Sequence, residues 1–590
     1  MKQLILLFTL LFFQVGFTQN NFVLAETYYR EGAYKKASQI YKDLYNKNPY
    51  NTTYLKRLVS CYQEENQFNT AKNLIKHSLK SNPNLTFLYV ILGHNYERQQ
   101  QKDSAEIQYK KALTSIDKNP NFSSITGYFF KEYNLLDEAI LAYKKGMLYI
   151  PKNNFSFQIA QIYGEQGDFQ KMFQSYINMV DKNEDYLQTV QRYISKYITE
   201  DAENKNNLLF KKTLLQKSIS NPKNVWNLLL SWLFTQQKEY RKAFIQEKAV
   251  FYRNPDDISN IASLGKIAFE NKDYQTAQNC FDFMFKKSNY NEDKLFALNY
   301  QTKIAVATKN PETEELFSQI FTNYGKNITT LEIQISYANF LTFQKNDPQK
   351  ALLILKEALS YSKSKFGKAK IKLKIGDVLV FTSKFNEALI YFSQIQTKLK
   401  NHPLAQEARF KVAQTSYFKG DFTWAKAQLK VLKSASTQLI ANDAVDLFIL
   451  ISDNEPVDSI PSGLIQYAHA EMLSYQQKNE QAINVLQQVI TNFKGHPIED
   501  EAYFKQAKLF ITTKNYERAV KNYQKIISLY PEGILIDDAY YDLAELYNNQ
   551  LKNTEKAKEY YQKVIFDFPS SIYLVDARKK FRKLRGDQIQ

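Results

Sequence analysis

The stretch Tyr34-Lys-Lys-Ala-Ser-Gln-Ile-Tyr-Lys-Asp-Leu-Tyr-Asn-Lys-Asn-Pro49 contains the unit from which most of the chain is built. Within it, Ala37, Tyr41 and Leu44 are three or four residues apart, so they fall on one face of a helix. Pro49 indicates where this helix has ended, because proline cannot extend a helix and disfavours helical geometry in the preceding residue. The stretch therefore predicts one helix whose apolar face carries a small residue and an aromatic one.

The unit recurs along the chain with a fixed period. Alanines stand 34 residues apart at Ala37, Ala71, Ala105 and Ala139. A proline follows an alanine after 12 residues in six places: Ala37–Pro49, Ala71–Pro83, Ala139–Pro151, Ala243–Pro255, Ala519–Pro531 and Ala557–Pro569. Two offsets that are kept this often indicate a repeat array.

This period and pattern resemble the tetratricopeptide repeat family, whose unit is a helix–turn–helix of about 34 residues with set small, aromatic and proline positions. The resemblance implies an all-α fold, a right-handed superhelical solenoid of stacked helical hairpins. In the first unit the matching residues are Leu24, Ala25, Tyr28, Gly32, Tyr34, Ala37, Tyr41, Leu44 and Pro49. The second unit matches at Leu58, Tyr62, Phe68, Ala71 and Pro83, with Val59 in place of the usual small residue.

A repeat array explains how a chain of 590 residues folds without one large core, since each unit buries its apolar face against its neighbours. We expect a signal peptide at 1–18, an N-terminal array at 19–186, partly degenerate hairpins at 187–330, a further array at 331–453, a loop at 454–463 and a C-terminal array with a basic capping helix at 464–590. The landmark residues fade at 185–222 and 289–327, where we expect bends in the superhelix.

The first residues predict export. Lys2 precedes an apolar run, Leu4 to Phe13, which is about half the ~20 residues that a membrane-spanning helix needs. A cleaved signal peptide is expected, and a retained anchor stays open as an alternative. The first cysteine is Cys61, so no lipoprotein anchor is expected. Cys61 and Cys280 lie about six repeats apart, too far to bridge, and this scarcity of cysteine favours the periplasm or the outer-membrane side of a Gram-negative bacterium.

The sequence predicts no enzyme. It has no Gly-rich phosphate loop with Lys and Ser/Thr, no His-Glu-x-x-His motif and no G-x-S-x-G nucleophile elbow. The five histidines are scattered over different repeats and their spacing makes no metal site. No cofactor, metal or catalytic residue is therefore expected.

The remaining candidate for a functional site is a surface, namely the concave face of the array, which the first helix of each repeat lines. Eight residues are expected on it, namely Glu26, Tyr29, Lys56, Arg57, His94, Glu97, Tyr128 and Lys131. The dicarboxylate clamp of chaperone-binding relatives needs basic and Asn residues at such places. Because Phe22 and Glu26 stand where the first of them should be, binding of a free C-terminal carboxylate by that mode is not expected.

The C-terminal third, from about 400 to 575, also resembles exported envelope proteins. Residues 496–503 and 530–540 are similar to the starts of repeats in lipoproteins of outer-membrane assembly and of the Tol–Pal system. The chain departs from those proteins in lacking their lipid-bearing cysteine.

The leading hypothesis is a non-enzymatic scaffold of the cell envelope that binds proteins or peptides in a concave groove. The alternative is binding of an anionic polymer or a membrane surface, because the net charge is +18 and the last helix is basic. Lysines on outward helix faces explain the same charge without such a partner, and nucleic acid is not an expected partner of an exported chain. The residues of the alternative site are Arg578, Lys579, Lys580, Arg582, Lys583 and Arg585.

Overall fold

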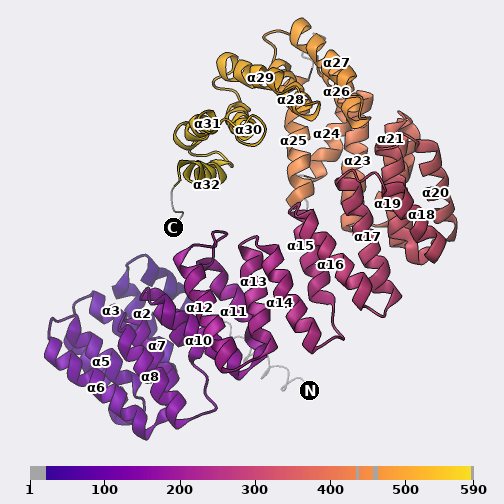
Figure 1. Ribbon diagram of the computed structural model, residues 1–590. Helices are drawn as coiled ribbons and strands as arrows, with labels where there is room; N and C mark the ends of the chain where they lie inside the picture. Colours follow the sequence, from indigo (N-terminus) through magenta and orange to yellow (C-terminus); the bar gives the residue numbers. More distant parts are fainter. Residues whose placement is uncertain (1–20, 433–437, 456–462, 587–590) are drawn as a thin grey trace, which may run out of the picture. The chain divides into compact units, whose positions relative to one another are not determined.

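Every regular element in the described part of the chain is a helix, and that part contains no strand. The computed structural model describes residues 21–432, 438–455 and 463–586 (Figure 1). The predicted all-α solenoid of stacked hairpins is confirmed. The predicted signal peptide and most of the predicted loop at 454–463 lie outside the described residues.

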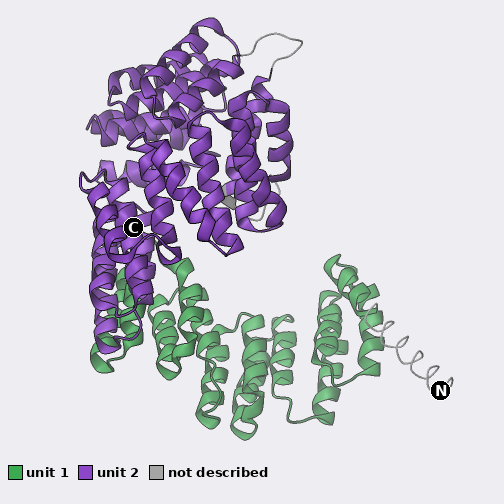
Figure 2. Cartoon of the chain, turned by 90° about the vertical axis from the view of Figure 1, so that its right-hand side faces the viewer, with its two compact units in different colours: residues 1–199, 205–233 green, residues 200–204, 234–590 purple. Residues whose placement is uncertain are grey.

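The helices form two compact units (Figure 2), unit 1 with residues 1–199 and 205–233 and unit 2 with residues 200–204 and 234–590. Residues 21–30 are helical, and α13 (Asn224–Gln236) crosses from one unit to the other. The other helices of unit 1 are α2 (Tyr34–Lys47), α3 (Thr52–Glu64), α4 (Phe68–Ser81), α5 (Phe87–Glu97), α6 (Lys102–Lys118), α7 (Ser123–Glu132), α8 (Leu136–Tyr149), α9 (Ser156–Glu165), α10 (Phe169–Lys182), α11 (Leu187–Ile194) and α12 (Lys205–Ser220).

Unit 2 is also made of consecutive helices joined by short connections. Its helices are α14 (Tyr240–Arg253), α15 (Ser259–Glu270), α16 (Tyr274–Lys287), α17 (Asn291–Ala307), α18 (Thr313–Tyr324), α19 (Leu331–Phe343), α20 (Pro348–Tyr361), α21 (Lys365–Phe381), α22 (Phe385–Lys398), α23 (Pro403–Lys419), α24 (Phe422–Leu432), α25 (Gln438–Asn454), α26 (Leu464–Tyr475), α27 (Asn479–Asn492), α28 (Ile498–Thr512), α29 (Tyr516–Leu529), α30 (Ile536–Asn549), α31 (Thr554–Asp567) and α32 (Leu574–Arg585).

The two helices of each repeat, which we call its first and second helix, pack side by side as a hairpin (Figure 1). The small residue of the first helix makes this packing close. A Cβ atom at Gly93 of α5 would lie 2.3 Å from Cε1 of Tyr109 on α6. Gly376 of α21 has the same relation to Phe392 of α22, again at 2.3 Å. The small residue and the aromatic residue that recur in each repeat of the sequence therefore pack against each other across the two helices of the hairpin.

The alanines and aromatic residues that reveal the period form the core. Ala37, Tyr41, Ala71 and Ala139 each have an exposed fraction of 0%. In the second repeat, Val59 takes the place of the small residue and is also buried. The 34-residue spacing of these residues therefore marks the positions that are buried between helices.

The degenerate segments keep their helices, with α11 and α12 in the first segment and α17 and α18 in the second. The predicted bends at these segments stay predictions. Cys61 and Cys280 are both buried and free, so the prediction that they are not bridged is confirmed.

Candidate functional site

The eight residues predicted for the concave face all lie on first helices of unit 1, and we call them the first-helix row. Glu26 and Tyr29 lie on the helix at 21–30, and the others lie in pairs on α3, α5 and α7. The repeat sets this placement, since residues in equivalent positions of stacked first helices face the same side. What the sequence does not give is how these side chains contact one another.

Glu26 and Arg57 join the first two repeats through a bidentate ion pair. Nε of Arg57 lies 2.7 Å from Oε1 of Glu26, and Nη2 lies 2.9 Å from Oε2. The hydroxyl of Tyr41 donates to the same carboxylate at 2.6 Å. Burial alone would raise the pKa of Glu26, but the hydrogen bonds from Tyr41 and Arg57 outweigh it and hold the pKa below its ordinary value. Glu26 is therefore a fixed anion that orients Arg57.

The guanidinium of Arg57 also covers an aromatic ring. Its Cζ lies 4.5 Å from the centre of the Tyr29 ring, a geometry that favours a cation–π interaction. Arg57 is thus held on one side by a carboxylate and on the other by a ring, which leaves few rotamers open to it.

Lys56 reaches across two repeats. Its Nζ lies 2.7 Å from Oε1 of Glu132 on α7, and it also lies 5.6 Å from the centre of the Tyr128 ring. Neighbouring helices pack about 8–10 Å apart. On a flat face, first helices two repeats apart would therefore be too distant for a lysine on one to contact a glutamate on the other. The Lys56–Glu132 contact therefore shows that this face of unit 1 curves inward. Tyr128 remains 50% exposed on it.

The remaining members of the row are also anchored. His94 stacks on Tyr133 with ring centres 3.9 Å apart. Burial lowers the pKa of His94 more than the nearby Glu97 raises it, so the imidazole is neutral at pH 7. The hydroxyl of Tyr109 donates to Glu97 at 2.7 Å, and Lys131 pairs with Glu165 on α9 at 2.8 Å. Each of these three side chains is therefore held by a partner on its own or another helix.

Models of known families match segments near both ends of the chain. A family model described as YpiA-like, C-terminal tetratricopeptide repeats matches residues 19–84, and tetratricopeptide repeat models match residues 88–119, 501–533 and 538–571. The chain contains tetratricopeptide repeats. No curated protein matches it.

Two solved structures are similar to the chain at low identity. One is the structure of Naa15/Naa10 bound to HypK-THB, with 12% identity, 96% of each chain covered and a TM-score of 0.29. The other is yeast Tom70, with 13% identity, 74% of this chain and 95% of that chain covered, and a TM-score of 0.31. Because both TM-scores are below 0.5, neither similarity bears on what these tetratricopeptide repeats bind.

The basic residues of α32, predicted as an alternative anion site, do not all face one way. Nζ of Lys580 lies 2.7 Å from Glu545 and 2.7 Å from Asp576, and Lys579 pairs with Glu200 at 2.6 Å. Burial would lower the pKa of Lys580, but its hydrogen bonds to these two carboxylates raise it. Arg578, Arg582 and Lys583 are exposed, as is Arg585, which lies over the ring of Phe581. Two of the six cations are therefore already neutralised within the protein.

Sequence reasoning missed an equivalent row in unit 2. Buried Asp377 lies between Lys374 at 2.9 Å and Lys411 at 3.1 Å. Further on, Glu471 pairs with Lys505 at 2.6 Å and accepts a hydrogen bond from Tyr417. The signal was available, because Asp377 and Glu471 directly follow the small residue of their first helix, as Glu26 follows Ala25.

The unit 2 row also holds a carboxylate without a cationic partner among the described residues. Burial, together with Asp500, Glu471 and Asp538, raises the pKa of Glu501 to about 7. Buried carboxylates that face one another disfavour ionisation. Glu501 is therefore only partly ionised near pH 7.

A hollow of about 880 Å3 lies in unit 1 between α2, α3 and α4. Its lining mixes leucines such as Leu55 and Leu74 with polar groups such as Asn73 and one lysine, Lys42. In the described residues no three His, Cys, Asp or Glu side chains are grouped to hold a metal ion. No described helix has the length and apolar character needed to cross a membrane.

Proposed function

We propose that the chain is a non-enzymatic scaffold of the bacterial cell envelope, on the periplasmic or outer-membrane side, that binds an extended segment of a partner protein along the first-helix row of unit 1. Tetratricopeptide repeats support a protein-interaction scaffold in general. The choice of this row, and the envelope setting, are what we add.

The observation that carries the proposal is the way the row is held in place before any partner arrives. Arg57 is fixed by Glu26 and Tyr29, and Lys56 is fixed by Glu132 and the Tyr128 ring. Binding then costs little side-chain entropy, which is how a preorganised surface gains affinity. Aromatic and arginine side chains are also the residues that most often dominate binding energy.

The curvature of unit 1 favours an extended segment over a flat surface. Lys56 and Glu132 come from first helices two repeats apart, so a partner in this groove is contacted by several repeats at once. Tyr128, half exposed beside them, offers a ring to a partner side chain.

The envelope setting rests on the N-terminal residues and on the cysteines. Lys2 and the apolar run that follows it have the form of a signal peptide. The two cysteines are buried and free, so the fold needs no disulfide in an oxidising compartment. The resemblance inferred from the sequence at 496–503 and 530–540, to repeat starts in lipoproteins of outer-membrane assembly and of the Tol–Pal system, is a further reason for proposing this setting.

Site-specific photo-crosslinking tests the surface. A photoreactive phenylalanine analogue replaces Tyr128 in the full chain, and envelope extracts are irradiated and analysed for crosslinked proteins. The matched control carries the analogue at Ile107 on the second helix α6, which is 54% exposed. We expect crosslinks to a protein partner from position 128 and not from 107, and we expect the double variant Lys56→Ala/Tyr128→Ala to bind that partner at least ~10-fold more weakly.

Two outcomes contradict the proposal in different ways. Crosslinks from 107 alone, or none from either position, would refute the first-helix row as the binding surface. Recovery of the chain only in the cytoplasmic fraction would refute the envelope setting and leave the surface to be judged by the crosslinks.

A further inference from the structure

A groove in unit 2 is lined by residues of two second helices, α14 and α16. Its volume is about 490 Å3. Its lining residues are Arg241, Phe244, Ile245, Lys248, Asn279, Asp282, Phe283 and Lys286. We call it the α14–α16 groove.

The lining forms two facing stripes. Arg241, Ile245 and Lys248 are four and three residues apart on α14, so they lie on one face of that helix. Asn279, Phe283 and Lys286 have the same spacing on α16. Each stripe spans two helical turns, about 10 Å, which is the length of about three residues of extended chain.

The groove has more cations than the protein neutralises. Among the described residues, Arg241, Lys248 and Lys286 make no ion pair with a carboxylate, whereas Lys374, Lys411 and Lys505 of the unit 2 first helices all do. The lining contains one carboxylate, Asp282, whose Oδ1 accepts hydrogen bonds from Gln278 and Gln301 at 2.7 Å each. Three cations therefore face the groove against one carboxylate that is already satisfied by amides.

The middle of the groove is apolar. The rings of Phe244 and Phe283 meet edge to face, with centres 5.9 Å apart and an interplanar angle of 87°. Ile245 is 53% exposed beside them, and Nζ of Lys248 lies 4.8 Å from the centre of the Phe244 ring. A half-exposed isoleucine in the same groove gains free energy when a partner's apolar side chain covers it.

We propose that the α14–α16 groove binds an acidic peptide segment of a partner protein, with an apolar residue on Ile245 and Phe283 and flanking carboxylates on Arg241, Lys248 and Lys286. Charge complementarity selects the carboxylates, and the apolar centre selects the residue between them. The carboxamide of Asn279, whose oxygen accepts from Gln275 at 3.4 Å, offers its N–H groups to a peptide carbonyl. A nucleic acid or phosphate polymer would bring phosphates to Asp282 and leave the apolar centre uncovered.

The α14–α16 groove and the first-helix row are made by different parts of the chain. The groove lies on second helices of unit 2, and the row lies on first helices of unit 1. Loss of one site should therefore leave the other intact.

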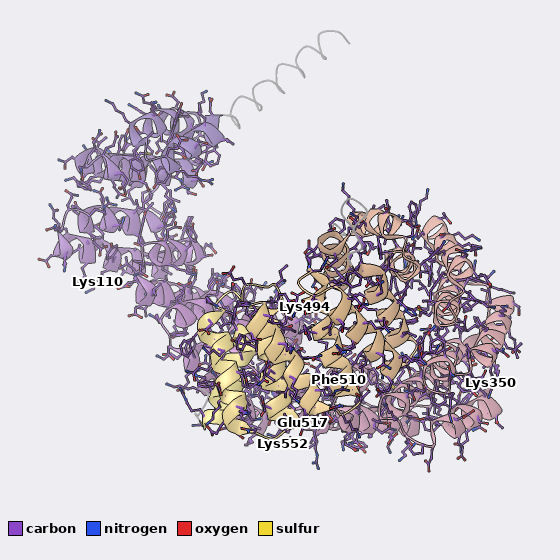
Figure 3. All side chains as sticks on the ribbon, turned by 90° about the horizontal axis from the view of Figure 1, so that it is seen from above. Lys110, Lys350, Lys494, Phe510, Glu517 and Lys552 are labelled. Atoms are coloured by element: carbon purple, nitrogen blue, oxygen red, sulfur yellow. The ribbon has the colours of Figure 1, made fainter. Side chains whose placement is uncertain are left out.

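The test uses the full chain and a fluorescein-labelled probe peptide, Glu-Glu-Leu-Glu-Glu-Leu-Glu-Glu, with fluorescence anisotropy as the readout. The triple variant Arg241→Gln/Lys248→Gln/Lys286→Gln removes the groove's cations. Its control, Lys110→Gln/Lys111→Gln/Lys118→Gln, removes the same charge from α6; Lys110 is labelled in Figure 3. We expect the groove triple variant to bind at least ~10-fold more weakly than the unchanged chain and the control to change by less than ~2-fold.

A second variant tests the apolar centre. Because Ile245 is half exposed, Ile245→Ser should leave the fold intact, which circular dichroism checks, and should weaken the Leu-containing probe by ~3-fold or more. A probe with Ser in place of both Leu residues should not respond to this change. Crosslinking from position 128 should be the same in all these variants.

Three results would overturn the proposal. One is absence of probe binding, and another is equal weakening in both triple variants, which would show unspecific charge attraction. The third is that the groove triple variant loses binding of a DNA duplex or polyphosphate but keeps binding of the probe peptide. This result would show that the groove binds phosphates.

Discussion

The contact between Gly376 and Phe392 gives the sharpest prediction about stability, because two opposing effects meet there. Gly376→Ala adds one methyl group to the middle of α21. In an open helix this change would stabilise by about 1 kcal/mol, since glycine loses more backbone entropy than alanine. At this position the new Cβ would lie 2.3 Å from Cε1 and 2.4 Å from Cζ of the Phe392 ring.

The steric term should dominate. Ordinary van der Waals contact begins at 3.4 Å, so the overlap exceeds 1 Å. Phe392 has an exposed fraction of 0%, so its ring cannot move aside into solvent. Overpacking of this kind costs about 1–3 kcal/mol, and we take the upper end, which leaves a net destabilisation of about 2 kcal/mol.

Phe392→Leu should relieve the overlap. The repeat formed by α23 and α24 already uses this combination, with buried Ala413 and buried Leu429 in the equivalent places. In a double-mutant cycle we therefore expect a favourable coupling energy of more than about 1 kcal/mol between Gly376→Ala and Phe392→Leu.

Hydrogen exchange is the suitable assay, because a long repeat array does not unfold in one step and local opening must be measured for each helix. Peptides from α21 and α22 should exchange faster in Gly376→Ala and regain protection in the double variant. Ala413→Gly is the matched control with the change reversed, and it should weaken protection in α23 by about 1 kcal/mol. If Gly376→Ala increased the protection of α21, the steric explanation of the small residue would be wrong.

Three further predictions follow from buried groups. Asp377→Ala should remove the carboxylate that pairs with Lys374 and Lys411 and cost about 1–3 kcal/mol, seen as faster hydrogen exchange in α21 and α23; unchanged exchange would contradict a structural role for this carboxylate. Glu501 has a pKa raised to about 7 by burial and by neighbouring carboxylates, so its contribution to stability is complete below about pH 4.5 and is lost as the pH rises through 7. In urea unfolding of the full chain, the C-terminal transition should therefore be up to about 3 kcal/mol more stable at pH 5 than at pH 8. Glu501→Gln should reduce this difference. If the difference persisted in that variant, another group would be its source. Ala139 has an exposed fraction of 0%, so Ala139→Asp buries an unpaired charge and should unfold the α7–α8 repeat. Limited proteolysis or hydrogen exchange would detect this unfolding. An unchanged melting curve would show that the repeat register is wrong.

The sequence determined the repeat, its register and the side on which each first-helix residue lies. These features are local, because a spacing of three, four and 34 residues fixes which side chains share a face and which are buried between two helices. The sequence alone therefore identifies Ala37, Tyr41 and Gly93 as repeat positions. The same register would also have pointed to Asp377, which directly follows its small residue in the sequence.

Only the tertiary structure decided which side chains contact one another. The Lys56–Glu132 pair spans two repeats, Lys580 pairs with two carboxylates, and the α14–α16 groove lies between two second helices. Such contacts depend on the small rotation from each repeat to the next, and these rotations add along the stack. Each rotation is set by the packing of two whole interfaces, which no single spacing in the sequence records.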